Sequence, residues 1–167
     1  ILDGWGIAQD KSVSAIDHAN TPYVDSLYPK YAHSRLDASG MSVGLPEGQM
    51  GNSEVGHMNL GAGRVVYQMH VKLNQAAEEN TFGENPELKK AFAYAKENSK
   101  SVHFMGLVSD GGVHSHINHL KGLLNAAHEA ELENVFVHAF TDGRDTDPYG
   151  GVGYIEDLSA HMQQTTG

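Results

Sequence analysis

The sequence predicts an α/β fold in which helices cover mainly parallel sheets in three layers. Two short apolar runs, at 102–108 and 135–140, flank a stretch whose apolar residues recur at helical spacing. A strand, a helix and a second strand at this spacing form a βαβ unit, whose strands lie parallel. Each run is followed within two residues by an Asp-Gly pair, at Asp110 and Asp142. Because ligands of such sheets bind beyond the carboxyl ends of the strands, these ends are candidate binding sites.

The remaining elements follow from local patterns. Residues 1–4, Ile-Leu-Asp-Gly, indicate the end of a buried strand whose beginning is missing, and so suggest a fragment. Thr21 as cap and Pro22 as first helical residue predict a helix start. The glycine-rich stretch 38–63 predicts a long loop of the functional kind. Further helices are predicted over 66–76, 88–95, 117–130 and from Asp147-Pro148 to about 162, with a domain boundary near residue 66.

Composition excludes several classes of protein. The 167 residues, 40% of them hydrophobic, suit one ordinary domain or parts of two larger ones. The chain has no cysteine, which excludes disulfides and thiolate metal sites and fits a reducing compartment, so we expect a cytoplasmic protein. A net charge of -10 without a basic run disfavours nucleic acid as a partner. No apolar stretch approaches the ~20 residues of a membrane span, so no membrane partner is expected.

Ser53 and Asp3 are the candidate residues of the first part of the chain. Ser53 lies between Gly51 and Gly56, before a stretch able to form a short helix. Backbone N–H groups and the dipole at a helix N-terminus stabilise phosphate and a developing alkoxide, so Ser53 is a candidate nucleophile. The alternative is that Ser53 caps the helix. Asp3 at a strand end can coordinate a hard cation, or it can simply form an Asp-Gly turn.

The later strand ends carry a second group of candidates. His114, His116 and His119 follow the first strand; His116 and His119 can share a helix face as a metal pair, or be solvated polar residues. Arg144 and Asp145 follow the second strand, where an Arg binds carboxylate or phosphate and an Asp can exchange a proton with a hydroxyl. We interpret Asp147 as a helix cap. The other histidines are interpreted as structural or surface residues: His18, His33, His70, His103, His128, His138 and His161.

Four segments together resemble one family of enzymes. They are ILDGWG at 1–6, GQMGNSEVGH at 48–57, SDGGVHSH at 109–116 and TDGRD at 141–145. Their order resembles that of the 2,3-bisphosphoglycerate-independent phosphoglycerate mutases of the alkaline phosphatase superfamily. The resemblance implies a glycolytic isomerase that interconverts 3-phosphoglycerate and 2-phosphoglycerate through a phosphoserine at Ser53. It also implies a pair of Mn²⁺ or similar ions, with Asp3 and Ser53 as ligands of one, and a glycerate held by His114, Arg144 and Asp145.

The same resemblance implies a domain organisation. Residues 1–66 would be the first segment of a phosphatase-type domain, and 67–167 the first part of an inserted transferase-type domain, together a fragment of a two-domain enzyme. Further Asp/His metal ligands and an arginine-rich phosphate clamp are expected beyond Gly167, so the fragment alone is expected to be inactive. The intact enzyme is expected to be a monomer acting on a small molecule. Asp147 stands where the family commonly has proline, a difference of little consequence for a cap.

Two alternatives remain from the sequence. One is a related metal-dependent phosphomonoesterase or phosphopentomutase, against which the His114 and Arg144-Asp145 loops argue, because a plain phosphatase need not retain its dephosphorylated product. The other is a non-catalytic, acidic, histidine-rich module that scavenges divalent metal through His114, His116 and His119.

Overall fold

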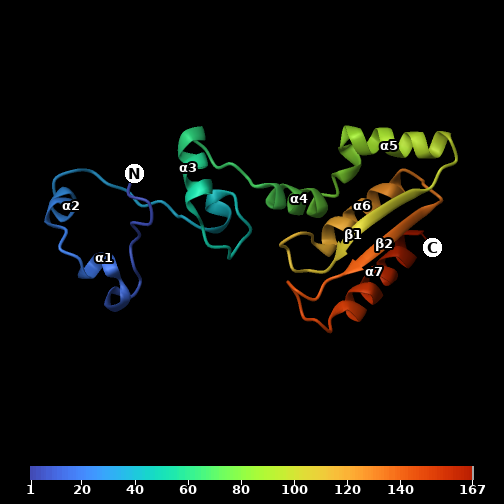
Figure 1. The fold of residues 1–167 in the computed structure, drawn as a ribbon. Helices are drawn as coiled ribbons and strands as arrows, with labels where there is room; N and C mark the ends of the chain where they lie inside the picture. Colours follow the sequence, from blue (N-terminus) through green and yellow to red (C-terminus); the bar gives the residue numbers. More distant parts are fainter. Residues whose placement is uncertain (167) are drawn as a thin grey trace. The chain divides into compact units, whose positions relative to one another are not determined.

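The computed structural model describes residues 1–166 and divides the chain into two compact units, Ile1–Gln68 and Met69–Gly167 (Figure 1). The expected assignment of 1–66 and 67–167 to two domain types stays a prediction. Among the described residues, no helix is both long enough and apolar enough to cross a membrane.

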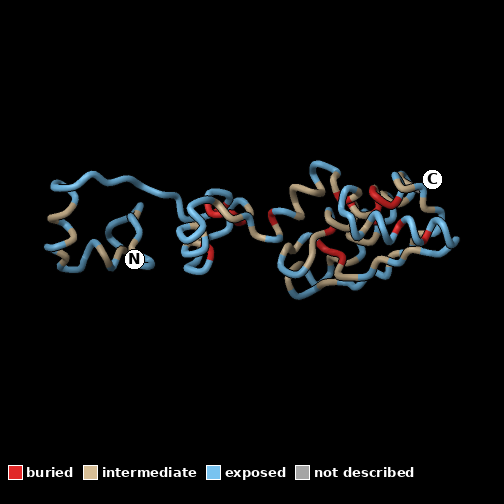
Figure 2. Tube along the Cα trace, turned by 90° about the horizontal axis from the view of Figure 1, so that it is seen from above, coloured by how far each residue is buried: buried red, intermediate tan, exposed pale blue. Residues whose placement is uncertain are grey.

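The first unit is built from short helices and loops. Its elements are η1 (Lys11–Val13), α1 (Ala15–His18), α2 (Pro22–Leu27), η2 (Gly40–Val43) and α3 (Ser53–Ala62). Positions 1–39 include no buried residue (Figure 2), and the only core cluster is Val43, Leu45 and Val55. The side chain of Asn59 fixes α3 to the loops around it, because it donates to the Val43 carbonyl oxygen at 3.0 Å and accepts from the Val66 N–H at 2.8 Å.

One local prediction for this unit is wrong. Residues 1–2 form no strand; the chain instead turns at Gly4, where φ is +77°. A strand needs a partner for its N–H and C=O groups, and the described residues supply none next to it. The predicted helix start is confirmed, with Thr21 at the N-cap position and Pro22 as the first helical residue. The Thr21 side chain makes no capping hydrogen bond, because its hydroxyl donates to the Asp25 carboxylate at 3.1 Å.

The second unit contains the predicted βαβ unit. Its elements are α4 (Met69–Glu78), η3 (Phe82–Glu84), α5 (Pro86–Glu97), β1 (Val102–Val108), α6 (Ile117–Glu129), β2 (Val135–Thr141) and α7 (Gly151–Thr166). Strands β1 and β2 pair in parallel, from Val102 opposite Val135 to Val108 opposite Thr141. The α/β class with a small parallel sheet is thereby confirmed.

Side chains alternate across the two faces of this sheet. Phe104, Val108 and Val137 face α6 and α7, where Leu124 and Leu158 complete the core. The opposite face carries the odd-numbered side chains of β1 and the even-numbered side chains of β2; Leu107 is half-buried there, and Met105 (69% exposed), Phe136 and Phe140 are among those open to solvent. The described residues therefore supply a sheet layer and a helix layer on one side of it. We call the opposite surface the open sheet face.

The last helix begins later than predicted. Helix α7 begins at Gly151, so Asp147 is not its cap. The Asp147 carboxylate accepts the Tyr149 N–H at 2.9 Å and its carbonyl oxygen accepts the Gly150 N–H at 2.9 Å. Pro148 therefore lies inside a turn that Asp147 closes, and this turn separates the end of β2 from α7.

Candidate functional site

Ser53 is the first residue of α3, and its neighbour caps the helix. The Asn52 side-chain oxygen accepts the Val55 N–H at 3.1 Å, which is the contact of an N-cap residue. The alternative that Ser53 is the cap is therefore wrong. The Ser53 hydroxyl stays exposed at the positive end of the helix dipole. A Cβ at Gly51 would collide with the Ala38 carbonyl oxygen, so glycine is required where the chain enters this turn.

His57 lies one helical turn after Ser53 and contacts it. Its Nδ1 is 2.8 Å from the Ser53 carbonyl oxygen and 3.2 Å from the Ser53 hydroxyl oxygen. The shorter contact requires an N–H on Nδ1, because a carbonyl oxygen only accepts. In that tautomer Nδ1 cannot take a proton from the hydroxyl. His57 thus orients the first turn of α3, and its Nδ1 atom is not placed to act as a base toward the Ser53 hydroxyl.

Asp3 lies in the N-terminal turn and is exposed. The turn reading of its Asp-Gly pair is confirmed by the Trp5 N–H donating to the Leu2 carbonyl oxygen at 3.2 Å. No hydrogen bond or ion pair within residues 1–166 engages the Asp3 carboxylate or joins it to Ser53. A carboxylate and a hydroxyl are hard oxygen donors that suit Mn²⁺ or Mg²⁺ in type. Two donors are short of a full set, and across the described part of the chain no three His, Asp or Glu residues are placed to hold a metal ion.

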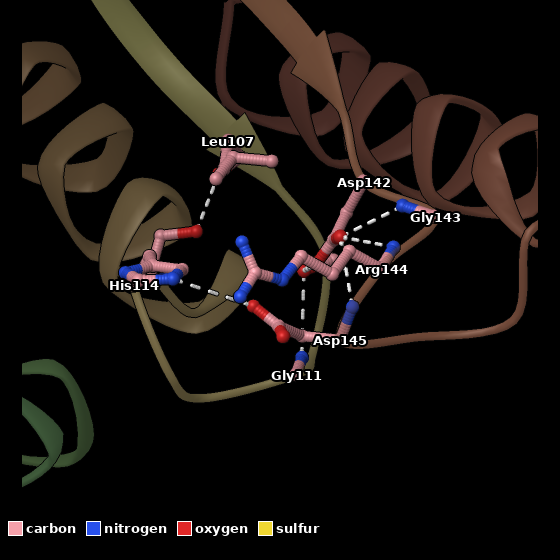
Figure 3. Close-up of polar contacts among 9 residues, drawn as sticks. Leu107, Gly111, His114, Asp142, Gly143, Arg144 and Asp145 are labelled. Carbon is pink, nitrogen blue, oxygen red and sulfur yellow. Dashed lines mark hydrogen bonds and ion pairs between the residues drawn. The ribbon is translucent and has the colours of Figure 1, made fainter.

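The two loops beyond the carboxyl ends of β1 and β2 bring three predicted residues together (Figure 3). The Nε2 atom of His114 lies 3.6 Å from the Asp145 Oδ2 atom; the His114 side chain is 60% exposed and the Asp145 side chain 19%. The Arg144 side chain extends from the second loop toward the side where His114 lies. An imidazole, a carboxylate and a guanidinium on adjacent loops can bind a small hydroxy acid and exchange protons with it.

Hydrogen bonds from side chains and from the backbone fix the first loop. The Ser115 hydroxyl donates to the Leu107 carbonyl oxygen at 2.8 Å, and the Ile117 N–H donates to the Ser109 carbonyl oxygen at 2.7 Å. The Tyr154 hydroxyl on α7 donates to the Asp110 carboxylate. His114 is thus carried on a loop that is attached to β1, α6 and α7.

Sequence reasoning missed two residues of this region, Ser109 and Asp142. Each ends a strand and precedes the candidate residues, and they hydrogen-bond to each other at 2.8 Å. The signal was present in the repeated Ser-Asp-Gly and Thr-Asp-Gly strand ends, but such a pattern is equally typical of a plain turn.

His116 and His119, for which the sequence left a metal pair and solvated polar residues as alternatives, are both engaged in hydrogen bonds. His116 caps α6, with its Nδ1 accepting the Asn118 N–H at 3.2 Å. His119 bonds the Asn74 side-chain oxygen on α4 at 2.6 Å, and the His70 ring lies 5.3 Å from the His119 ring. Both rings are half-buried and hydrogen-bonded; the bond of His116 stays within the start of α6, and the bond of His119 joins α6 to α4.

This arrangement lowers the pKa of His119 to about 4, first because burial disfavours the charged ring and then because His70 and His116 lie close to it. The unfolded chain, with a pKa near 6.5, binds a proton that the folded chain does not bind between pH 6.5 and 4. Stability is therefore full above pH 6.5 and falls as the pH drops toward 4. With solvent screening of the part-exposed ring, we expect His119 to account for a loss of about 1 kcal/mol.

Urea unfolding of the 167-residue chain at pH 7.5 and pH 5 measures this loss. The His119→Gln variant keeps a side chain that can donate to Asn74 but removes the titrating ring, so the pH-dependent loss should shrink. An equal loss in both proteins would assign it to other groups.

The fold and these loops define an α/β protein with polar side chains gathered beyond the carboxyl ends of parallel strands, which is where proteins of this class bind their ligands. Comparison with known proteins places it more narrowly. Residues 73–167, more than half of the chain, match the family model described as the BPG-independent PGAM N-terminus. The chain belongs to the family of 2,3-bisphosphoglycerate-independent phosphoglycerate mutases.

Individual relatives agree with this placement. The chain is 59% identical over 99% of its length to the 2,3-bisphosphoglycerate-independent phosphoglycerate mutase of Flavobacterium johnsoniae, and 58% identical over its full length to that of Bacteroides thetaiotaomicron. It spans 33% of each. Among solved structures, the chain is similar to Leishmania mexicana phosphoglycerate mutase, crystallised at low cobalt concentration, with a TM-score of 0.63 and 32% sequence identity. The match covers 99% of this chain and 30% of the Leishmania chain.

Proposed function

We propose that this chain contributes the nucleophile and the glycerate-holding loops to an enzyme that interconverts 3-phosphoglycerate and 2-phosphoglycerate in glycolysis and gluconeogenesis. The observation that carries the proposal is the exposed Ser53 hydroxyl at the first position of α3, a helix that Asn52 already caps. A hydroxyl with no capping task, next to free backbone N–H groups, suits attack on a phosphate. The family membership supplies the substrate class.

The proposed reaction has two steps. In the first, Ser53 Oγ attacks phosphorus, the bond from phosphorus to the 3-oxygen breaks, and the serine loses its proton while the glycerate oxygen gains one. In the second, the 2-hydroxyl of the same glycerate attacks the phosphoserine and restores the serine hydroxyl. Three side chains retain glycerate between the steps: His114, Arg144 and Asp145. Arg144 binds the carboxylate of glycerate. Asp145 accepts protons from the glycerate hydroxyls and returns them. Splitting one transfer into two lowers the barrier of each.

A metal is part of the proposal. Asp3 and Ser53 would be two ligands of one of a pair of Mn²⁺ ions, and further ligands have to come from elsewhere. A bound divalent ion would lower the pKa of the hydroxyl and offset phosphate charge. Three observations support this role of a metal. Asp3 and Ser53 offer hard oxygen donors, the His57 Nδ1 atom is engaged with the Ser53 carbonyl oxygen and so does not act as a base, and the Leishmania relative was crystallised with cobalt.

We further propose a cytoplasmic, monomeric enzyme whose partner is the small substrate. In this proposal residues 1–66 belong to a phosphatase-type domain and residues 67–167 to a transferase-type domain.

The test uses this chain in place of the matching third of the Flavobacterium johnsoniae relative, a protein that we call the completed enzyme. Supplied with Mn²⁺ and 3-phosphoglycerate carrying labelled phosphate, it is expected to form labelled 2-phosphoglycerate with little free phosphate. The 167-residue chain alone is expected to show no turnover. Predominant release of free phosphate would favour the phosphomonoesterase alternative, and no turnover by the completed enzyme would overturn the proposal.

A further inference from the structure

The Asp142 carboxylate is the centre of the loop that carries Arg144 and Asp145. Its Oδ1 atom accepts three consecutive backbone N–H groups, from Gly143 at 2.7 Å, Arg144 at 3.0 Å and Asp145 at 3.2 Å (Figure 3). An oxygen that holds three successive amides fixes the φ and ψ angles between them. The directions in which the Arg144 and Asp145 side chains leave the backbone are therefore set by Asp142.

The second oxygen of the same carboxylate reaches the other loop. Its Oδ2 accepts the hydroxyl of Ser109 at 2.8 Å, and Ser109 is 1% exposed at the end of β1. The Ser109 hydroxyl also accepts the Gly111 N–H at 3.4 Å. One carboxylate thus connects the loop of Arg144 and Asp145 to the loop of His114.

The two loops also touch directly. A Cβ placed on Gly111 would lie 3.2 Å from the Thr146 methyl and 3.3 Å from the Asp145 Cβ, so the backbones approach closely at this point. Such packing keeps the loops together but does not set the rotation of each peptide group. That task remains for the hydrogen bonds to Asp142.

The bonds require an ionised carboxylate. Four donors face its two oxygens, and such donors stabilise the ionised form over the protonated one. The N–H of Arg144 first, then the Ser109 hydroxyl and the N–H of Asp145, lower the pKa of Asp142 to about 2. The connection between the loops is therefore intact throughout the neutral and mildly acid range.

We propose that Asp142 and Ser109 are positioning residues, which hold Arg144 and Asp145 against His114 so that glycerate is retained between the two phosphoryl transfers. The inference rests on the proposed function and adds to it two residues that need not touch substrate. It predicts a selective defect. Return of the phosphoryl group to glycerate is impaired more than phosphorylation of Ser53, because only the return step requires free glycerate to stay on these loops.

The experiment measures mutase turnover and the division of product in the completed enzyme. Asp142→Ala should lower the rate of 2-phosphoglycerate formation by about 10²-fold, the loss expected when reacting groups are misplaced by about 1 Å. The fraction of substrate phosphate that appears as free phosphate should rise, because phosphoserine whose glycerate has escaped is hydrolysed. Asp142→Asn keeps an oxygen for the three N–H groups and should recover most of the rate. Ser109→Ala, which removes only the connection, should lose about 10-fold.

Asp147→Ala is the matched control, since Asp147 is an aspartate of the same loop whose side chain holds only the Tyr149 N–H. It should change rate and product division less than twofold. If Asp142→Ala does not fold, as judged by circular dichroism, Asp142→Asn and Ser109→Ala decide.

A folded Asp142→Ala enzyme with an unchanged rate, or one with a lower rate but the unaltered division of product, would overturn the inference. Inactivity of the unaltered completed enzyme would instead overturn the proposed function, and the inference with it.

Discussion

The Ser53→Ala variant of the completed enzyme is expected to lose at least about 10⁴-fold in mutase rate, because removal of a covalent nucleophile abolishes both transfers. Substrate phosphate should no longer become attached to the protein, whereas the unaltered enzyme stopped in acid should yield phosphoserine at position 53. Both measurements use labelled 3-phosphoglycerate. The loss should be purely chemical, because Asn52 and not Ser53 caps α3.

Ser26→Ala is a suitable control for this variant. Ser26 is another helical serine, half-buried on α2, and its hydroxyl donates only to the Tyr23 carbonyl oxygen at 2.7 Å. It should leave the rate within about twofold, since surface substitutions of this kind change little. Retention of a tenth or more of the rate by Ser53→Ala would show that Ser53 is not the nucleophile.

The Leu124→Ala variant is expected to lose about 3 kcal/mol of unfolding free energy. Leu124 is 1% exposed in the middle of α6 and packs with Val108 and Leu158 between the sheet and α7. Truncation of such a side chain removes its transfer free energy and leaves a cavity that close packing cannot fill. Urea unfolding followed by circular dichroism measures the loss, with the slope against urea concentration expected to stay unchanged.

Met105→Ala is the control for that measurement. It also deletes a large apolar side chain from the second unit, but Met105 lies on the open sheet face and is 69% exposed. It should cost less than about 1 kcal/mol, because there is no cavity to create. Similar losses for the two variants would mean that α6 does not pack on the sheet as described.

The sequence predicted correctly those elements whose conformation is determined by neighbouring residues in the chain. The apolar runs of β1 and β2 and the helical spacing of α6 predicted the βαβ unit within about one residue at each end, because periodicity reports directly on which side chains are buried. The predicted proximity of strand ends also explains why His114, Arg144 and Asp145 share one region.

The sequence-based predictions fail where the local structure depends on residues that are distant in the sequence. Whether residues 1–2 form a strand depends on a neighbouring strand, which no local pattern encodes. Asp147 before Pro148 is compatible with both a cap and a turn, and only the position of α7 separates them. The contact of Asp142 with Ser109 spans 33 positions of sequence and is invisible to motif reading. The roles of Asp3 and Ser53 as metal ligands stay predictions.

The open sheet face has a consequence for handling the chain in solution. Parallel strands normally have both faces covered, and a two-stranded sheet is at the lower limit of what persists in water. Met105, Phe136 and Phe140 are exposed apolar side chains on this face, beside the stacked rings of His103 and His138. The backbone groups along the outer sides of β1 and β2 are available to another strand. Copies of the isolated chain can therefore stack face to face or add edge to edge. We therefore expect self-association to limit the concentration at which the isolated chain can be studied.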